Sequence, residues 1–510
     1  MAATSLYQSS YPPQLTPEQQ EYLATTVHEW TITNGLVVRL RSANGAAEDS
    51  ETSHAGTIPI TLFPSRFPAD CFLEALEIQT AYNRLYAAVA SDEEWLGRVV
   101  QELAPIDSFI AKLWEIHETV KAEGYVQDLS FGLFRSDYMV HYPETQERPT
   151  IKQVEINVNS AAFGGLAPQV TSLHRYLNSV NAYPESASST IRAGSLPPNP
   201  STERIVAGLA ATHAAYGPSP SNHPLCIVLI VQDIERNVFD QKHLELSLFS
   251  ETKANVFRLP FTQVLQHTRL DTERRLLYSP PAFPDRIYEV STVYFRAGQS
   301  PDEYNEVTWE ARTHLERSRA IKCPSVLLHL AGFKKVQQIL ATPDSPHLAR
   351  FLAAERECER VRATFAPMYP MDMSLDGLKG REMATNPEIA KRFVLKPQRE
   401  AGGNNIYRGA IPAFLQNVPE SQWPGYVLME MIEPPAQRNA ILRDGELQSG
   451  GVICELGVWG TVLWRRTDQG IEVLKNDEAG YLLRTKSDQS EEGGVAAGFG
   501  SLDSVCLVDV

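Results

Sequence analysis

Apolar residues recur with helical spacing in the first quarter of the chain. The segment LTPEQQEYLATTVHEWTITNG places Thr16 as an N-cap, Pro17 as the first helical residue and Gln19 as the second member of a capping box. Two further helical patterns follow, at roughly 71–90 and 94–124. The sequence therefore predicts that helices precede the first long strand.

From about residue 129 the spacing of apolar residues changes from helical to alternating. LSFGLFRSDYMVHY and TIKQVEINVNSAAFGGL predict two adjacent strands joined by a polar turn. In the second strand, Glu155, Asn157 and Asn159 share one face and alternate with apolar residues. Carboxylate and amide oxygens gathered in this way suit a hard cation, although a sheet with one solvated face has the same pattern.

A separate α/β unit is predicted in the middle of the chain. Residues 183–223 are rich in Pro, Ser and Asn around one helix at about 202–215, which marks a boundary. The run LCIVLIV that follows is apolar throughout, as expected of a parallel strand buried on both faces. STVYFRAG, at 291–298, is its predicted partner strand.

The last third of the chain again mixes helical and extended patterns. Helices are predicted at about 332–342 and 346–365, and strands at 392–397, 426–432 and 451–465. We therefore expect three regions: 1–224 as the N-terminal part of the body, 225–331 as an α/β domain, and 332–510 as the remaining body with glycine-rich loops.

Composition and charge narrow the class of protein. Of the 510 residues, 43% are hydrophobic, and the formal net charge of −16 disfavours nucleic acid and anionic membranes as partners. The six scattered cysteines form no CxxC pair, which favours reduced thiols in a cytoplasmic protein. The N-terminus lacks the pattern of a signal peptide, and no window of about 18 apolar residues predicts a membrane span.

Several common catalytic motifs are absent from the sequence. The twelve histidines form no HExxH pattern and there is no GxSxG, so a zinc or serine hydrolase is disfavoured. Neither GxGxxG after an apolar strand nor GxxxxGK[ST] occurs, so the Rossmann and P-loop fingerprints are also missing.

The segment KPQREAGGNN follows a short apolar strand and gathers charge at a glycine turn. Backbone N–H groups at Gly402 and Gly403 can approach phosphate oxygens because no side chain intervenes, and Lys396 adds a positive charge. Glu400 would repel a phosphate unless a divalent cation bridges the two groups, as Mg²⁺ does through oxygen ligands. A hairpin turn with a surface ion pair is the alternative.

A second polar segment, QDIERNVFDQ, comes directly after LCIVLIV, where open α/β sheets bind ligands. Glu235, Arg236, Asn237 and Gln241 suit a zwitterionic ligand, or else the segment is an ordinary helix start capped by Asp233. Several cations stand at strand ends or in loops, where they either balance carboxylates or gather around an anionic substrate and ATP: Arg135, Arg296, Lys334, Lys335, Arg484 and Lys486.

Together these segments resemble the eukaryotic glutathione synthetase family. The shared motifs include TLFPSRFP, FGLFRSDYM, QVEIN with FGGL, QDIERNVFDQ, VYFRAG, LAGFKKVQQ, RFVLKPQREAGGNN, YVLMEMIEPP, CELGVWG and LLRTKSDQSEEGGVAAG, in the family order from about residue 59 to 498. The resemblance implies an α/β (α+β) ATP-grasp fold with an inserted α/β substrate-binding domain and a glycine-rich lid. It also implies a homodimer that uses ATP and Mg²⁺ to join γ-glutamylcysteine to glycine.

The resemblance further implies roles for individual residues. The magnesium ligands would be Glu155, Asn157 and Glu400. The nucleotide contacts would be Glu155, Lys334, Lys396, Glu400, Gly402, Gly403, Asn404, Asn405, Tyr407, Met429, Glu430, Met431, Ile432, Glu455, Lys486 and Glu492. The dipeptide and glycine contacts would be Arg135, Ser160, Glu235, Arg236, Asn237, Gln241, Arg296, Arg484, Val495 and Ala496. Lys396 and Arg484 would act in the chemistry itself, with Arg484 facing the glycine carboxylate.

The chain departs from the family pattern at several positions, which leaves two other hypotheses open. Ala401 stands where the family has glycine, Ala162 where serine is usual, and Met431 where lysine is common, while Ala297 and Glu492 replace aspartates. These differences are compatible with a non-catalytic nucleotide- or peptide-binding relative, or with a sister ligase that uses another amine. The small residues of GGVAAG favour glycine as the acceptor.

Overall fold

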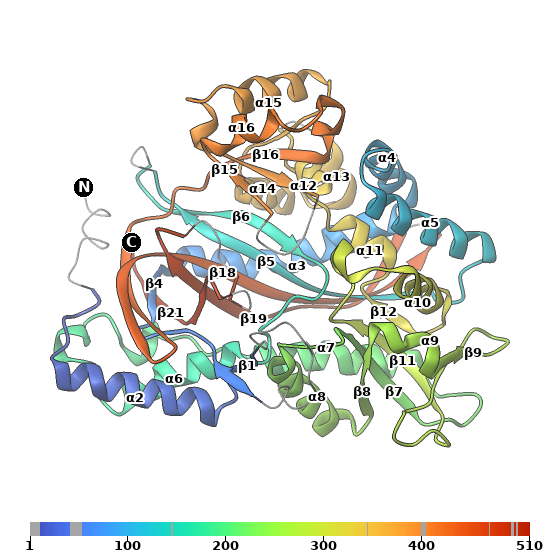
Figure 1. The fold of residues 1–510 in the computed structure, drawn as a ribbon, viewed down its shortest axis with the longest axis horizontal. Helices are drawn as coiled ribbons and strands as arrows, with labels where there is room; N and C mark the ends of the chain where they lie inside the picture. Colours follow the sequence, from blue (N-terminus) through green and yellow to red (C-terminus); the bar gives the residue numbers. More distant parts are fainter. Residues whose placement is uncertain are drawn as a thin grey trace.

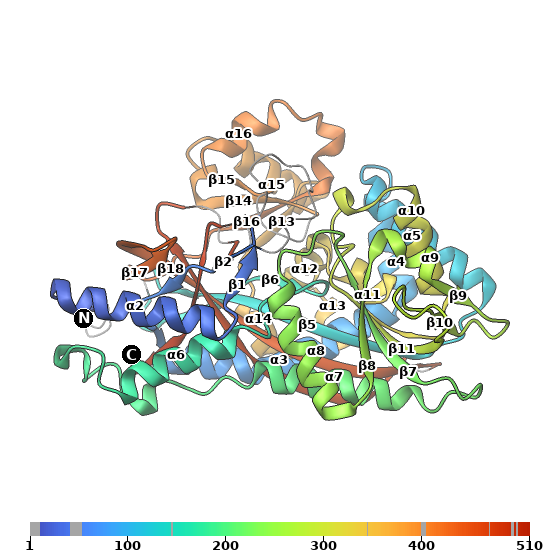
Figure 2. The same ribbon diagram turned by 60° about the horizontal axis from the view of Figure 1, so that its bottom comes forward.

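The computed structural model describes residues 11–40, 54–143, 146–343, 345–398, 404–468, 470–490, 494–495 and 498–510. The chain forms a long central sheet, a mostly parallel sheet to one side of it, and a small sheet that stands above it (Figure 1 and Figure 2). Helices cover the outer faces of all three sheets. Among the described residues, none of the helices combines the length and the apolar character that a membrane span requires.

The N-terminal helices follow the capping signals in the sequence. Helix α2 (Pro17–Thr33) begins with the predicted capping box, in which the side chains of Thr16 and Gln19 each accept a hydrogen bond from the other's backbone N–H. Helix α3 (Ala69–Ser91) packs against the central sheet. The single helix predicted at 94–124 is wrong, because Asp107 accepts hydrogen bonds from two backbone N–H groups and starts a new helix. The segment therefore forms α4 (Glu93–Leu103) and α5 (Ser108–Glu123).

The central sheet has seven strands in the order β17-β3-β20-β19-β18-β5-β6. Their bounds are Gln437–Arg443 (β17), Ile60–Thr61 (β3), Ser501–Asp503 (β20), Gly470–Ser487 (β19), Glu446–Thr467 (β18), Leu129–His141 (β5) and Thr150–Asn157 (β6). The antiparallel register places Arg484 opposite Glu455 and Asp137 opposite Glu155. Because facing residues of adjacent strands lie close together, charged side chains of four strands meet in one region.

The side sheet has the order β8-β7-β11-β10-β9, with β12 beside β11. Its strands are Leu225–Val231 (β7), Asn255–Pro260 (β8), Thr268–Leu270 (β9), Leu276–Tyr278 (β10), Tyr288–Phe295 (β11) and Ile321–Cys323 (β12). β7 runs parallel to both β8 and β11, so the buried parallel strand predicted from LCIVLIV is confirmed. The surrounding helices are Ser201–Tyr216 (α7), Val238–Thr252 (α8), Val264–His267 (α9) and Glu306–Arg317 (α10).

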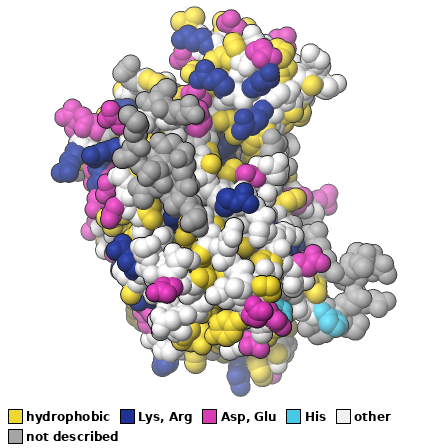
Figure 3. Space-filling model, turned by 90° about the vertical axis from the view of Figure 1, so that its left-hand side faces the viewer, with side chains coloured by type: hydrophobic (Ala, Val, Ile, Leu, Met, Phe, Trp, Pro, Cys, Tyr) yellow, Lys and Arg dark blue, Asp and Glu magenta, His cyan; other side chains and the backbone are white. Residues whose placement is uncertain are grey.

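The small sheet has four strands in the order β13-β16-β14-β15. They span Met368–Pro370 (β13), Phe393–Pro397 (β14), Ile406–Tyr407 (β15) and Tyr426–Glu430 (β16), and helices Leu375–Thr385 (α15) and Ala410–Leu415 (α16) cover them. β14 and β15 are antiparallel, and KPQREAGGNN contains the end of β14 and the residues that connect it to β15. The small sheet and its helices, called the cap below, rise above the central sheet (Figure 1), and the upper part of the molecule stands out as a lobe in the space-filling view (Figure 3).

Shorter elements complete the chain. The helix predicted at 346–365 is wrong as a single element, because residues 352–354 interrupt it between His347–Phe351 (α13) and Glu355–Thr364 (α14). The other α-helices are Ala167–Ser179 (α6), Val326–Ala331 (α11) and Lys334–Ala341 (α12). Six 3₁₀ turns are described, at Glu185–Ala187, Ala193–Ser195, Phe261–Gln263, Pro301–Glu303, Ala390–Arg392 and Glu420–Gly425. Two further two-stranded sheets pair Val37–Arg39 (β1) with Ala55–Thr57 (β2), and Ser65–Pro68 (β4) with Val505–Val508 (β21).

A buried carboxylate anchors the C-terminal tail, to which the sequence assigned no role. Asp503 accepts hydrogen bonds from the hydroxyls of Ser65 and Thr485, each at 2.6 Å, and from the backbone N–H of Ser504 at 2.7 Å. These contacts join β20 to strands β4 and β19. Burial raises the pKa of Asp503 to about 6, even though the hydrogen bonds oppose that rise.

The raised pKa predicts a pH-dependent stability that Asp503→Asn removes. The protonated carboxyl stabilises the fold fully below the unfolded-state pKa of about 3.9, and this contribution is lost as the pH rises through the folded-state value of about 6. The free energy of unfolding of the wild type minus that of Asp503→Asn should therefore fall by about 3 kcal/mol between pH 4 and pH 7, and the difference in Tm should fall with it. Thermal unfolding at several pH values measures it, and a difference that is constant with pH contradicts it.

Candidate active site

A cavity of about 350 Å³ lies between the cap and the central sheet. It is lined from both sides, by residues of β14, β15 and β16 in the cap and of β5, β6, β18 and β19 below. The lining brings together many residues that the sequence assigned to the nucleotide and its surroundings: Glu155, Lys396, Asn405, Tyr407, Met429, Glu430, Met431, Ile432, Glu455, Arg484 and Lys486.

Part of the cavity lining is apolar, and we call this part the apolar slot. Met429, Met431 and Ile432, which the sequence assigned to the adenine, line it together with Met139 and Ile453. The last two were missed by the sequence analysis. Each lies two residues from a charged residue of the site, Met139 from Asp137 and Ile453 from Glu455, so the two-residue period of a strand was the signal that could have found them.

Two buried lysines lie beside this slot. Lys396 donates a hydrogen bond from Nζ to the carbonyl oxygen of Val154 at 2.9 Å, and Lys334 Nζ lies 2.8 Å from Oε2 of Glu155. Burial and the neighbouring charge of Lys334 lower the pKa of Lys396 to about 8. Burial alone would raise the pKa of Glu155, but the ammonium groups of Lys334 and Lys396 hold it well below its ordinary value. The carboxylate thus stays ionised between two cations.

The residues present fit a magnesium ion. Glu155 supplies an ionised carboxylate, and the amide nitrogen of Asn157 donates to Asp137 at 2.9 Å, so that the amide oxygen of Asn157 is on the opposite side. Oxygen donors of this kind are what Mg²⁺ prefers. Among the described residues no group of three or more His, Cys, Asp or Glu side chains could hold a metal ion. The third predicted ligand, Glu400, falls outside the described residues, as do Gly402, Gly403, Glu492, Ala496 and Ala401.

The central sheet also contains a buried network of arginines and carboxylates. Asp137 accepts hydrogen bonds from Nε and Nη2 of Arg135, at 2.7 and 2.9 Å, and from Nη2 of Arg484 at 2.8 Å. Arg484 also forms an ion pair with Glu455. Burial raises the pKa of Glu455, as do the charges of Asp137 and Glu155, while Arg484 opposes that rise. The sequence analysis predicted Arg135, Arg484 and Glu455 but missed Asp137.

The residues assigned to the dipeptide form a second cluster at the start of α8. Arg296 and Asn237 both donate to Asp240, at 3.4 and 3.2 Å, and Arg296 also donates to the carbonyl oxygen of Ala161. Several buried polar atoms there have no hydrogen-bond partner among the described residues: Oδ1 of Asn237, both side-chain atoms of Gln241, and Nε of Arg296. Because buried polar groups are normally paired, these donors and acceptors are available to a polar ligand.

Backbone contacts join the two clusters. Arg135 donates from Nη1 to the carbonyl oxygen of Ala162 at 3.1 Å, next to the carbonyl of Ala161 that Arg296 contacts. The glycine turn beyond is clamped to α8, because Asp240 accepts hydrogen bonds from the N–H groups of Phe163 and Gly165. The contact at position 162 is made by its backbone, so alanine in place of serine does not affect it.

The remaining predicted residues lie less centrally. Arg236 donates from Nε to the carbonyl oxygen of Arg39 on β1, and Val495 is buried in a hydrophobic core. The hydroxyl of Ser160 donates to Asn159 at 3.1 Å, and Lys335 pairs with Asp372 in the cap. The alternative of Asp233 as a helix cap is wrong, because α8 begins at Val238 and Asp233 instead accepts from Thr262.

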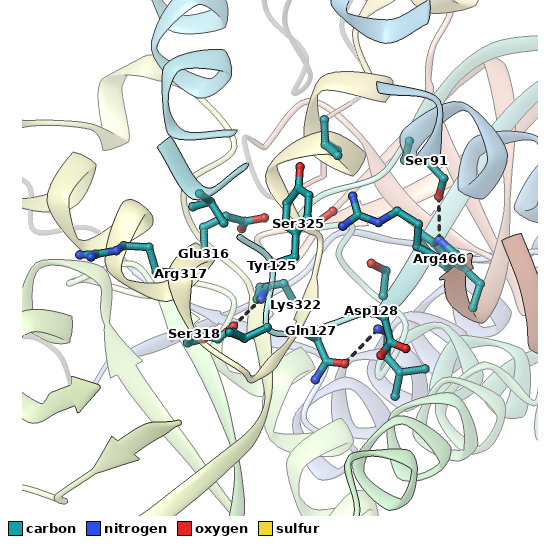
Figure 4. A pocket seen from close by; sticks show the side chains of 17 residues that line it. Ser91, Tyr125, Gln127, Asp128, Glu316, Arg317, Ser318, Lys322, Ser325 and Arg466 are labelled. Atoms are coloured by element: carbon teal, nitrogen blue, oxygen red, sulfur yellow. Dashed lines mark hydrogen bonds between the residues drawn. The ribbon is translucent and has the colours of Figure 1, made fainter. Parts of the chain in front are cut away.

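A second, smaller cavity of about 60 Å³ lies at the far end of the central sheet (Figure 4). Its polar lining includes Lys322, whose Nζ donates to the carbonyl oxygen of Ser318 at 2.8 Å. Burial lowers the pKa of Lys322 to about 8. None of the residues that the sequence assigned to ATP, metal or substrate lines this cavity, so we do not place the reaction there.

Comparison with known proteins gives one consistent result. A family model described as "Eukaryotic glutathione synthase, ATP binding domain" matches residues 17–507. Glutathione synthetase of Mus musculus is 37% identical over 96% of this chain and 97% of its own, and the glutathione synthetase large chain of Schizosaccharomyces pombe is 36% identical over 96% and 98%. The solved structure of a glutathione synthetase-like effector from Globodera pallida has a TM-score of 0.73 at 19% identity, covering 97% of this chain and 98% of that one, and so has the same fold.

Proposed function

Since the chain belongs to the eukaryotic glutathione synthase family, we propose that the cavity below the cap is where it joins γ-glutamylcysteine to glycine with the use of ATP. The reaction is that of an ATP-dependent ligase and yields glutathione, ADP and phosphate, the second step of glutathione biosynthesis. One observation carries the placement. An apolar slot, the buried Lys396 and the ionised Glu155 line the same cavity as Arg484, and Lys334 contacts Glu155.

The geometry suits phosphoryl transfer followed by amide formation. The cysteinyl carboxylate attacks the γ-phosphorus of ATP, ADP leaves, and the glycine amine then displaces phosphate from the acyl carbon and loses a proton. Lys334 and Lys396 would neutralise the phosphate oxygens, while Arg484 would hold the glycine carboxylate; Lys396 and Arg484 line the cavity, and Lys334 contacts Glu155 of its lining. Bound Mg²⁺, held by Glu155 and Asn157, would add positive charge near the phosphates. Most of the rate enhancement would come from alignment and charge neutralisation.

Ligand binding must rearrange ion pairs that the protein makes with itself. The ammonium of Lys334 lies on Glu155, and the ammonium of Lys396 lies on a backbone carbonyl. A cation at Glu155 and phosphates at the lysines would give each of these three side chains a ligand of opposite charge. The unpartnered atoms of Asn237, Gln241 and Arg296 would take the zwitterionic γ-glutamyl group of the dipeptide. We therefore assign the dipeptide contacts of region 225–331 to these residues.

We also propose that the protein is a homodimer located in the cytoplasm. The family resemblance supports a homodimer, which light scattering coupled to size-exclusion chromatography tests. All six cysteines are buried and unpaired, which supports a reducing compartment such as the cytoplasm. The net charge of −16 supports the absence of nucleic-acid and membrane partners. The glycine-rich lid implied by the sequence falls largely on residues outside the described ranges.

Phosphate release should require both substrates at once. We expect ATP turnover with γ-glutamylcysteine plus glycine and little with either alone, because the acyl phosphate needs the dipeptide and its discharge needs the amine. Colorimetric phosphate measurement with mass spectrometry of the product tests this, and serine and β-alanine replace glycine in parallel reactions. Binding of ATP and dipeptide without a product would favour the non-catalytic relative. Preference for another amine would favour the sister ligase.

A further inference from the structure

Asp137 occupies an unusual position in the central sheet, although no part of the sequence analysis singled it out. Its side chain is fully buried on β5, and it accepts hydrogen bonds from three residues: Arg135, Asn157 and Arg484. From the family resemblance, Arg135 was assigned to the dipeptide and glycine, Asn157 to the metal, and Arg484 to the glycine carboxylate. One carboxylate thus contacts three residues with different roles in the reaction.

The contacts orient each partner. Two parallel N–H donors of Arg135 bind both oxygens of Asp137, which sets the plane of that guanidinium. The ring of Trp459 lies 5.5 Å from the same guanidinium carbon, and Nη1 reaches the carbonyl of Ala162. Nη2 of Arg484 donates hydrogen bonds to Asp137 and Glu455, while Nε of Arg484 is buried with no partner among the described residues. Arg484 therefore keeps a donor available for a ligand.

The neighbouring strand leaves space for this arrangement. Gly457 on β18 faces Asp137 across the sheet. A Cβ atom at Gly457 would lie 2.7 Å from Cδ of Arg135 and 2.8 Å from Oδ1 of Asp137, both closer than van der Waals contact allows. The glycine in CELGVWG is therefore explained by the ion pair that lies over it, independently of the hydrogen bonds themselves.

We infer that Asp137 is a positioning residue, which holds Arg135 and Arg484 at the spacing that the dipeptide and glycine require. This inference rests on the proposed function. It requires that loss of the charge at position 137 affects the peptide and glycine more than ATP, because Asp137 bonds both arginines, whereas Lys396 bonds the carbonyl oxygen of Val154 and Lys334 bonds Glu155.

Asp137→Asn tests the inference with little change in volume. The asparagine side chain has only one acceptor oxygen. Its NH₂ group would face N–H donors of Arg135, Asn157 and Arg484, so these hydrogen bonds would be lost. We expect kcat/KM for γ-glutamylcysteine and for glycine to fall about 100-fold, and KM for ATP to stay within about twofold. Calorimetric titration should show weaker dipeptide binding with nucleotide binding retained, which a purely structural role would not produce.

Gly457→Ala provides a second variant that keeps every charge. Its methyl group displaces the pair of Arg135 and Asp137, so it should give the same selective defect even if Asp137→Asn fails to fold. One matched control is Asp503→Asn, at another buried carboxylate, which accepts hydrogen bonds from the hydroxyls of Ser65 and Thr485. The other is Gly450→Ala, on the same strand as Gly457, where an added Cβ meets no atom within 4 Å. Both controls should keep wild-type KM values at pH 7.5.

The outcomes separate this inference from the proposed function. Equal losses for ATP and dipeptide, or unchanged kinetics in both Asp137→Asn and Gly457→Ala, overturn the positioning role. A wild type that binds ATP and dipeptide yet forms no product overturns the proposed function, whereas the comparison of dipeptide binding between wild type and the variants still decides the role of Asp137.

Discussion

Glu155→Gln is expected to reduce kcat/KM by about 10³-fold while the fold is retained. The neutral amide keeps the shape of the side chain and can still accept a hydrogen bond from Lys334. In the wild type, Nζ of Lys334 lies 2.8 Å from Oε2 of Glu155. It removes the negative charge that the two ammonium groups stabilise, and with it the attraction for a divalent cation. The Mg²⁺ concentration needed for half-maximal rate should therefore rise together with the loss of rate.

Magnesium titration of turnover, at saturating ATP, dipeptide and glycine, measures this effect. Glu478→Gln is the matched control, because Glu478 also forms an ion pair from the central sheet, with Arg204, but does not line the cavity. The control should keep wild-type rates and magnesium dependence. If Glu155→Gln keeps near-normal turnover at low Mg²⁺, the carboxylate is not a metal ligand and the assignment must be withdrawn.

Lys396→Met is expected to reduce kcat/KM for ATP by about 10³-fold without loss of stability. The methionine fills nearly the same volume as the lysine stem, but it cannot neutralise a phosphate oxygen. In the ligand-free protein the lysine is a buried cation whose pKa is lowered to about 8, so replacing it with an apolar side chain should leave Tm unchanged or raise it. Loss of activity combined with unchanged or higher stability separates a functional lysine from a structural one.

Steady-state kinetics and thermal unfolding on the same preparation give both quantities. Lys152→Met on β6 serves as control, since Nζ of Lys152 also donates to backbone carbonyls, of Ala363 and Phe365, but lies outside the cavity lining. We expect wild-type kinetics for Lys152→Met. A modest effect of Lys396→Met on turnover, below about tenfold, would place the phosphates elsewhere in the cavity.

The features that could be predicted from the sequence are those whose signal lies in neighbouring residues. The capping box of α2 and the apolar run of β7 involve neighbouring residues, and both predictions are confirmed. The helix break at Asp107 was missed because the helical spacing of apolar residues continues across it, while the cap depends on two side-chain hydrogen bonds. Asp137 was missed for a related reason: in sequence it is only a polar residue in FGLFRSDYM, and its partner Arg484 is supplied by a strand far along the chain.

The sequence by itself determined the residues and motifs of the family, the class of the fold, and the types of chemical group available to ATP, a cation and a zwitterion. Only the tertiary structure decided which groups share a cavity and which bind one another. Strand pairing brought Arg484 of β19 to Asp137 of β5, the packing of helix α12 brought Lys334 to Glu155, and the bare Cα of Gly457 left room for the pair beside it. The physical reason is that hydrogen bonds and ion pairs act over a few ångströms, whereas these partners are separated by hundreds of residues along the chain.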